Sequence, residues 1–248
     1  MTDSQVSVRF APELWLFLKA RHRRDEVAVA HDGTSSLGHL VESLGVPLTE
    51  VGELAVGDRP VDPSYRPTTG ALVRVSAVRR PQEIPVVPLR LLLDVHLGAL
   101  ARRLRLVGVD TAYRNDLDDD ELIERANADR RVLLTQDRAL LCRRALWLGA
   151  YVRGAHPDDQ LADVLGRFAP RPAPWTRCTA CNGLLAAVAK TEVEELLQPG
   201  TRRTYHRFAR CRDCGQVYWH GAHHAKLEAI VSRATRLQPS LTRPPTAL

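Results

Sequence analysis

Residues 89–168 alternate short apolar segments with helical patterns, and this alternation constrains the fold more than any other feature of the sequence. Four apolar runs predict strands at 89–93, 109–113, 131–135 and 150–152. Apolar residues at intervals of three to four predict helices at 97–107, 118–129, 138–145 and 159–168. A regular succession of strand and helix favours an α/β fold, with a parallel sheet and helices on both of its faces.

The first of these helices is expected to be amphipathic and to end at Gly108. Leu97, Leu100, Ala101 and Leu104 recur at helical spacing and define its core face. Three arginines are therefore expected on the opposite, solvated face: Arg102, Arg103 and Arg105.

Aspartates stand where these strands end. Asp94 directly follows the first strand, and Asp137 lies just past the third. Asp116 follows the second strand, and Asp119 begins the next helix on the side that its apolar residues define. Because ligands of open α/β sheets bind beyond the carboxyl ends of the strands, we expect these carboxylates to converge. Clustered carboxylates repel one another unless a cation lies between them, and hard oxygen ligands suit Mg²⁺ or Mn²⁺.

Several of these acids also have structural interpretations. Asp118 is placed to cap the helix that follows it, and Asp120 and Glu121 favour the positive end of the helix dipole. Asp116 fits a turn. Asp94 and Asp137 are harder to explain in this way, because each follows an apolar strand closely.

Residues 1–80 show the pattern of a small β-grasp domain. Strands are expected at 6–10, 27–29 and 71–78, with a short helix at 37–45 that ends in a glycine. The pattern is similar to the ubiquitin-like sulfur carriers, which end in a free Gly-Gly. Here the last strand runs into Arg79-Arg80-Pro81 and the chain continues, so carrier chemistry has no carboxylate to act on. We expect an interaction or substrate-positioning module, with a protein partner as one use of its surface.

Four of the five cysteines form two matching pairs, Cys178-x-x-Cys181 and Cys211-x-x-Cys214. Paired CxxC knuckles predict a structural zinc site with four thiolate ligands. The fifth, Cys142, is expected to be a buried and inert thiol in a helix.

The formal charge of +6 is concentrated near the C-terminus. Residues 169–248 hold 12 Lys and Arg against 5 Asp and Glu, a net charge of +7. Basic residues interleaved with aromatics indicate contact with single-stranded or tRNA-like RNA, through phosphate pairing and base stacking. The candidates are Arg202, Arg203, Arg207 and Arg210. Alternatively, aromatics such as Phe208, Tyr218 and Trp219 pack the core of the zinc ribbon.

Two motifs carry a family resemblance. The pattern D-x-x-L-G-x-L-A-R-x-L-R begins at Asp94, and L-L-T-x-D-R ends at Arg138. Through them, residues 89–231 resemble the Mut-seven C-terminal RNase family, a branch of the PIN-like nucleases. That family joins a PIN-like fold to a zinc ribbon, and some members carry an N-terminal ubiquitin-like domain. The resemblance implies RNA cleavage and places the family's strand-end acids at Asp94, Asp119 and Asp137, with Asp116 as a further candidate.

These observations predict a ribonuclease that depends on Mg²⁺ or Mn²⁺, with a structural zinc ion. A non-catalytic RNA-binding adaptor is the alternative. Phosphoryl transfer through Asp94 fits less well, because His96 stands where a dehalogenase-type phosphatase has its second aspartate, and residues 89–168 contain no lysine.

The predicted organisation has four parts: a β-grasp domain at 1–80, a PIN-like domain at 89–168, a zinc ribbon at 169–236 and a disordered tail at 237–248. The chain shows no secretory signal and no apolar run of about 20 residues, so we expect a cytoplasmic protein without membrane contact.

Overall fold

The structure, a computed structural model, describes residues 5–219, 221 and 224–236. The predicted disordered tail at 237–248 lies outside the described residues. The chain divides into two compact units. The first unit comprises Met1–Arg80 and Thr135–Tyr151, and the second comprises Pro81–Leu134 and Val152–Leu248.

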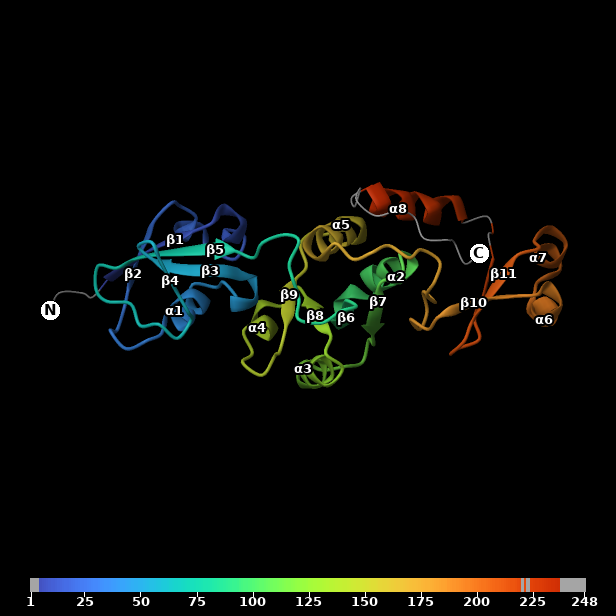
Figure 1. The fold of residues 1–248 in the computed structure, drawn as a ribbon, viewed down its shortest axis with the longest axis horizontal. Helices are drawn as coiled ribbons and strands as arrows, with labels where there is room; N and C mark the ends of the chain where they lie inside the picture. Colours follow the sequence, from blue (N-terminus) through green and yellow to red (C-terminus); the bar gives the residue numbers. More distant parts are fainter. Residues whose placement is uncertain (1–4, 220, 222–223, 237–248) are drawn as a thin grey trace. The chain divides into compact units, whose positions relative to one another are not determined.

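The N-terminal part of the first unit is a β-grasp domain, which confirms the predicted fold (Figure 1). Its sheet has the order β2-β1-β5-β3-β4, with β1 and β5 parallel and the other neighbours antiparallel. The elements are β1 (Gln5–Phe10), β2 (Val27–Ala30), α1 (Leu37–Ser43), β3 (Val51–Val56), β4 (Arg59–Val61) and β5 (Leu72–Ala77).

Helix α1 packs on this sheet because its apolar residues face the strands. Ser36 caps it by accepting a hydrogen bond from the backbone N–H of His39, and Leu37 and Val41 are fully buried. Gly45 follows the helix with a φ of +101°, and a Cβ there would approach the carbonyl oxygen of Phe17 to 2.9 Å. Glycine is therefore required where the chain leaves α1 and passes Phe17.

The first unit also contains a segment from the region predicted to be PIN-like. This segment, Thr135–Tyr151, holds α4 (Arg138–Leu141) and β9 (Gly149–Tyr151). The helix predicted at 138–145 is too long, because α4 makes about one turn and ends at its C-cap, Cys142. Leu140 and Leu141 are the buried residues of α4, so the helix has two adjacent apolar residues and not the longer amphipathic face that was expected.

The second unit contains three parallel strands in the order β7-β6-β8. Figure 1 shows α2 and α5 on one side of these strands and α3 on the other, as the α/β prediction requires. Every residue of β6 after its first is buried, as are all four of β8, so the strands are covered on both faces. The elements are β6 (Arg90–Leu93), α2 (Gly98–Leu106), β7 (Asp110–Tyr113), α3 (Asp119–Ala128), β8 (Val132–Thr135) and α5 (Pro157–Phe168).

The remainder of the second unit is an antiparallel ribbon of β10, β11 and β12. Phe208 and Val217 from these strands pack with Val193 and Leu197 in a small core. The elements are β10 (Leu185–Val188), α6 (Lys190–Val193), α7 (Pro199–Thr204), β11 (Phe208–Cys211), β12 (Val217–Trp219) and α8 (His224–Arg236). Within the described part of the chain, no helix is both long and apolar enough to cross a membrane.

Candidate functional site

The four paired cysteines come together in the second unit. The Sγ atoms of Cys178 and Cys214 lie 3.6 Å apart, and those of Cys181 and Cys211 lie 3.4 Å apart. All four lie within 4.8 Å of one another. Sulfurs around a tetrahedral zinc ion, with Zn–S bonds of about 2.3 Å, are separated by about 3.8 Å. The residues therefore fit a zinc ion held by four cysteines.

The neighbours of Cys178 favour its thiolate form, whereas burial raises the pKa of Cys181 to about 12. Burial raises the pKa of Cys178, but hydrogen bonds from the Tyr218 hydroxyl and from backbone N–H groups outweigh burial and bring this pKa to about 7. Gly183 closes the knuckle, where a Cβ would come within 2.8 Å of the Cys211 sulfur. The small residue is needed because backbone and sulfur approach each other closely.

Arg105 joins the first knuckle to β7 of the parallel sheet, contrary to its predicted place on the solvated face of α2. It is 3% exposed. Its Nε donates to the carbonyl of Thr111 (2.9 Å), and its Nη1 donates to those of Thr179 (3.1 Å) and Ala180 (2.7 Å). The prediction was wrong because the ribbon packs against the side of the helix that sequence periodicity assigns to solvent.

A second polar contact joins the ribbon to β7. Asp110 accepts hydrogen bonds from Arg131 (2.6 Å) and from the Asn182 side chain (2.9 Å), and it pairs with Arg177 at 3.3 Å. Burial raises the pKa of Asp110, but these donors outweigh burial and hold the pKa below its usual value. The first CxxC knuckle is therefore anchored by buried or half-buried polar groups.

Asp94 directly follows β6 and is buried, with 5% of its surface exposed. Its backbone N–H donates to the carbonyl of Leu134 at 3.0 Å, so the ladder between β6 and β8 continues to this residue. Its carbonyl accepts from the N–H of Leu97 in the 3₁₀ turn that follows. The sheet thus fixes the backbone of this acid.

The turn between β7 and α3 contains several carboxylates with different partners. Asp116 forms a two-pronged pair with Arg114, with N–O distances of 2.9 and 2.5 Å, and this pair lowers the pKa of Asp116. Asp118 caps α3 in a capping box with Glu121, as predicted. Asp119, the first residue of α3, is exposed. Asp116 is paired with Arg114 and Asp118 caps the helix, so Asp119 is the acid of this trio best placed to accept a ligand.

Asp137 lies in the first unit, just before α4. Its Oδ1 accepts from the backbone N–H groups of Ala139 (2.7 Å) and Leu140 (3.4 Å). Its own N–H donates to the Thr135 hydroxyl at 2.8 Å. Asp137 is therefore an N-cap whose second carboxylate oxygen, Oδ2, is not used by these bonds.

The structure brings the cysteines together more fully than the acids. Among the described residues, one group of three or more His, Cys, Asp or Glu side chains lies close enough together to bind one metal ion, and it consists of the four cysteines. Asp94, Asp116 and Asp119 belong to the second unit and Asp137 to the first. Their convergence around one cation stays a prediction.

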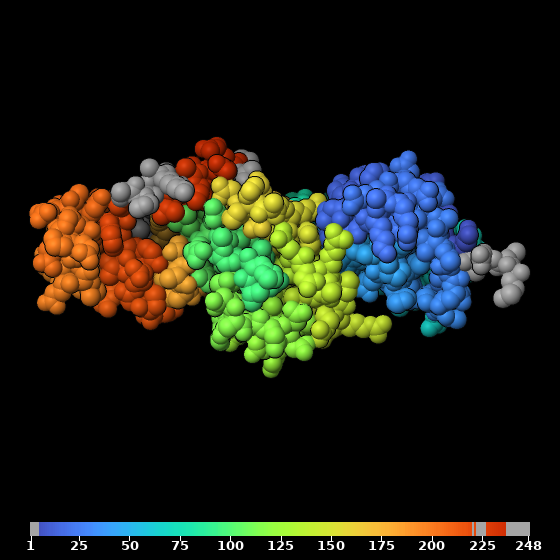
Figure 2. All heavy atoms as spheres, turned by 180° about the vertical axis from the view of Figure 1, so that it is seen from behind, coloured from blue at the N-terminus to red at the C-terminus, as the bar shows by residue number. Residues whose placement is uncertain are grey.

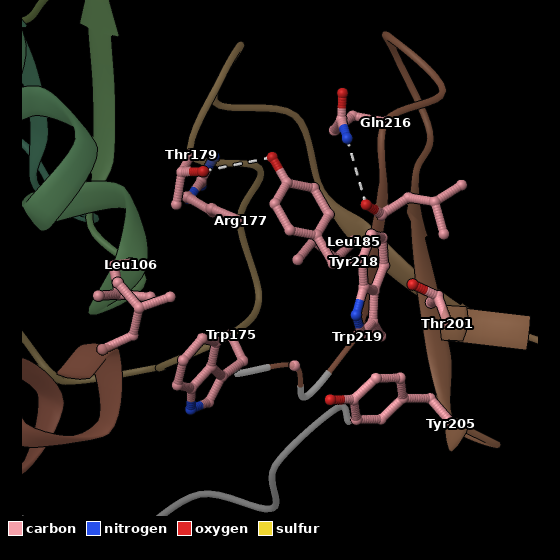
Figure 3. Close-up of a pocket in the computed structure, with 13 residues that line it drawn as sticks. Leu106, Trp175, Arg177, Thr179, Leu185, Thr201, Tyr205, Gln216, Tyr218 and Trp219 are labelled. Carbon is pink, nitrogen blue, oxygen red and sulfur yellow. Dashed lines mark hydrogen bonds between the residues drawn. The ribbon is translucent and has the colours of Figure 1, made fainter. Parts of the chain in front are cut away.

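A pocket of about 450 Å³ opens beside the ribbon in the second unit (Figure 3). Figure 3 shows Trp175 on one side and Tyr205 with Trp219 on the other, and the Tyr218 hydroxyl turned toward Thr179. Trp219 is 37% exposed. Phe208, in contrast, is buried in the ribbon core, which confirms the core interpretation for this residue.

Trp175 is an aromatic lining residue that sequence reasoning missed. It follows three prolines, Pro170, Pro172 and Pro174, in a segment without helical or strand periodicity. Its φ is +62°, a conformation that is rare for a bulky side chain. The backbone there is held by a hydrogen bond from its N–H to the carbonyl of Leu106.

The predicted RNA-binding arginines are all exposed: Arg202, Arg203, Arg207 and Arg210. The first two lie on α7, whose Thr201 lines the pocket. Figure 2 shows the α6–α7 segment, in orange, at the surface of the second unit. Positive charge therefore adjoins the aromatic pocket.

Two family models match the chain. The model of the Mut7-C RNAse domain matches residues 89–231, more than half of the 248 residues, and that of the Mut7-C ubiquitin domain matches residues 3–83. No curated protein and no solved structure matches it.

Proposed function

The chain belongs to the family defined by the Mut7-C RNAse domain, and from this premise we propose that it is a metal-dependent ribonuclease. In this proposal, Asp94, Asp119 and Asp137 hold Mg²⁺ or Mn²⁺ and RNA phosphodiester bonds are hydrolysed there. The bound cation supplies an activated water and stabilises the leaving oxygen.

The observation that carries the proposal is the position of Asp94. This buried carboxylate stands at the carboxyl end of a parallel strand, where open α/β sheets bind their ligands. Asp119 is exposed at the first turn of α3, and Asp137 has one oxygen that its capping bonds do not use. Carboxylate oxygens of this kind are the ligands that Mg²⁺ and Mn²⁺ prefer.

Asparagine variants test the proposal. Purified protein with Mn²⁺ or Mg²⁺ is expected to cleave single-stranded RNA, and Asp94→Asn, Asp119→Asn or Asp137→Asn should each reduce the rate about 10²–10³-fold. Asn is as good an N-cap as Asp, so Asp137→Asn removes the charge without removing the cap. Asp116→Asn should have a milder effect, because Arg114 already takes both of its oxygens.

The neighbouring Asp120→Asn is the matched control for charge loss in the first turn of α3, and it should retain the wild-type rate. Full activity of Asp94→Asn, or cleavage that persists with excess chelator, would refute the metal mechanism. The alternative, a non-catalytic RNA-binding adaptor, requires that wild-type protein bind RNA and cleave none with either metal.

We also propose that the ribbon holds single-stranded RNA, with a base in the aromatic pocket and phosphates at the neighbouring arginines. Stacking on aromatic side chains is worth about 1–3 kcal/mol per base and requires bases that are not paired. Trp175→Ala should therefore weaken binding of single-stranded RNA roughly fivefold or more and leave binding of duplex RNA unchanged. Phe208 is not an informative target, because it packs the core. Equal affinity of wild type and Trp175→Ala for single strands would exclude the pocket.

A further inference from the structure

We propose that the ubiquitin-like domain is a positioning element of the nuclease, which fixes the segment that carries Asp137. The inference rests on the proposed function, because it takes Asp137 to be a ligand of the catalytic cation. In this inference, the surface around Phe17 and Glu50 binds a segment of the same chain, Thr135–Tyr151.

Arg138, the residue after Asp137, makes the first contact. Its Nη1 donates to the carbonyl of Phe17 and its Nη2 to that of Leu16, both at 2.9 Å. The guanidinium carbon also lies over the Phe17 ring, 5.3 Å from the centroid. Two hydrogen bonds to successive carbonyls and a contact with a ring fix both the position and the orientation of the planar guanidinium.

Tyr151, at the other end of the segment, makes the second contact. Its backbone N–H donates to Oε1 of Glu50 at 2.8 Å, and Glu50 is only 2% exposed. Its ring meets that of Phe17 edge to face, with centroids 5.0 Å apart and an angle of 82°. Phe17, 2% exposed, therefore contacts both ends of Thr135–Tyr151.

These contacts reach Asp137 through α4. Oδ1 of Asp137 caps this one-turn helix, and Arg138 is the first residue of the same helix. A four-residue helix has little stability of its own, so its position depends on the surface that holds it. Fixing α4 thus fixes the direction in which Oδ2 points within the first unit. Groups that orient a metal ligand typically change metal affinity or activity about 10–100-fold when they are removed.

The last strand of the domain has no carrier function to perform. After β5 the chain continues through Arg79 and Arg80 instead of ending in a free carboxylate. In the proposed role, the domain instead binds and positions Thr135–Tyr151 of the same chain.

The test uses the full-length protein and measures kcat, KM for single-stranded RNA and the half-saturating Mn²⁺ concentration. Arg138→Ala should lower kcat and raise the half-saturating Mn²⁺ concentration, each about 10-fold or more, with KM unchanged. Excess Mn²⁺ should restore most of the rate. Arg74→Ala is the control, because Arg74 pairs with Asp58 on the exposed surface of the same domain.

A second pair of variants keeps the test decisive if Arg138→Ala folds poorly. Glu50→Gln retains an oxygen that accepts from the Tyr151 N–H, so it should keep the wild-type Mn²⁺ dependence. Glu50→Ala loses that acceptor and should shift the dependence in the same direction as Arg138→Ala. Hydrogen exchange at the Tyr151 amide should become faster in Glu50→Ala only.

A purely structural role would lower the melting temperature and leave the Mn²⁺ dependence of the folded protein unchanged, and this result in both Arg138→Ala and Glu50→Ala would overturn the inference. Failure of the proposed function is separate, since it appears as activity in Asp137→Asn or as a wild-type protein that does not cleave RNA.

Discussion

Replacing Arg105 by alanine removes the guanidinium that joins α2 and β7 to the first zinc knuckle. Three carbonyls lose a charged donor, those of Thr111, Thr179 and Ala180. Hydrogen bonds to charged groups contribute about 1.5–3 kcal/mol each, but removing a buried cation also recovers its desolvation cost, which is several kcal/mol. We expect a net loss of about 2–4 kcal/mol in the free energy of unfolding, a large share of the stability of an ordinary domain.

The measurement is urea unfolding at saturating zinc, together with zinc release to a competing chelator. Arg105→Ala should be destabilised and should release zinc faster, because Thr179 and Ala180 lie within the knuckle between Cys178 and Cys181. Arg102→Ala is the matched control, since Arg102 is an exposed arginine on the same helix, and it should stay within about 0.5 kcal/mol of wild type. Equal stabilities of the two variants would refute the role assigned to Arg105.

The other predictions concern zinc, pH and salt. Metal analysis should find one zinc ion per chain, and Cys178→Ser should lower both zinc content and melting temperature, because a structural zinc ion supplies folding free energy; a metal-free protein with the wild-type fold would contradict this. The pKa of Asp110 is lower in the folded than in the unfolded protein, so ionised Asp110 stabilises the fold above the unfolded pKa of about 3.9. This stabilisation is lost as the pH falls through the folded pKa. In urea titrations, Asp110→Asn should therefore be less stable than wild type at pH 7 and approach the wild-type stability below about pH 4. Replacing Arg202, Arg203 and Arg207 by alanine should reduce the slope of log affinity against log salt for single-stranded RNA by about 2, and an unchanged slope would remove them from the interface.

Local signals in the sequence predicted local structure well. Asp118 caps α3 as predicted, and the helix that was expected to end at a glycine does end before Gly45, which has a positive φ. The spacing of Cys178 and Cys181 predicted the first half of the cysteine cluster because a CxxC turn brings its own two sulfurs together. In each case, the interacting residues lie within a few positions of one another.

Contacts between distant segments could not be predicted in this way. Arg105 has the helical spacing of a solvated residue, and only the packing of the ribbon, more than 70 residues later, buries it. Trp175 stands in a proline-rich segment that has no periodicity, so its place in the pocket had no local signal. The grouping of Thr135–Tyr151 with the β-grasp domain likewise depends on contacts such as that of Arg138 with Phe17.

The first unit and the ribbon present different kinds of interaction. The contacts that hold Thr135–Tyr151 are hydrogen bonds to backbone carbonyls and aromatic contacts, which salt screens weakly. The ribbon instead presents exposed arginines whose attraction to phosphates falls steeply with salt. Since the ubiquitin-like domain and Thr135–Tyr151 belong to one chain, their contacts do not depend on the concentration of a partner. Ionic strength should therefore govern RNA capture at the ribbon, while the position of Asp137 is built into the fold.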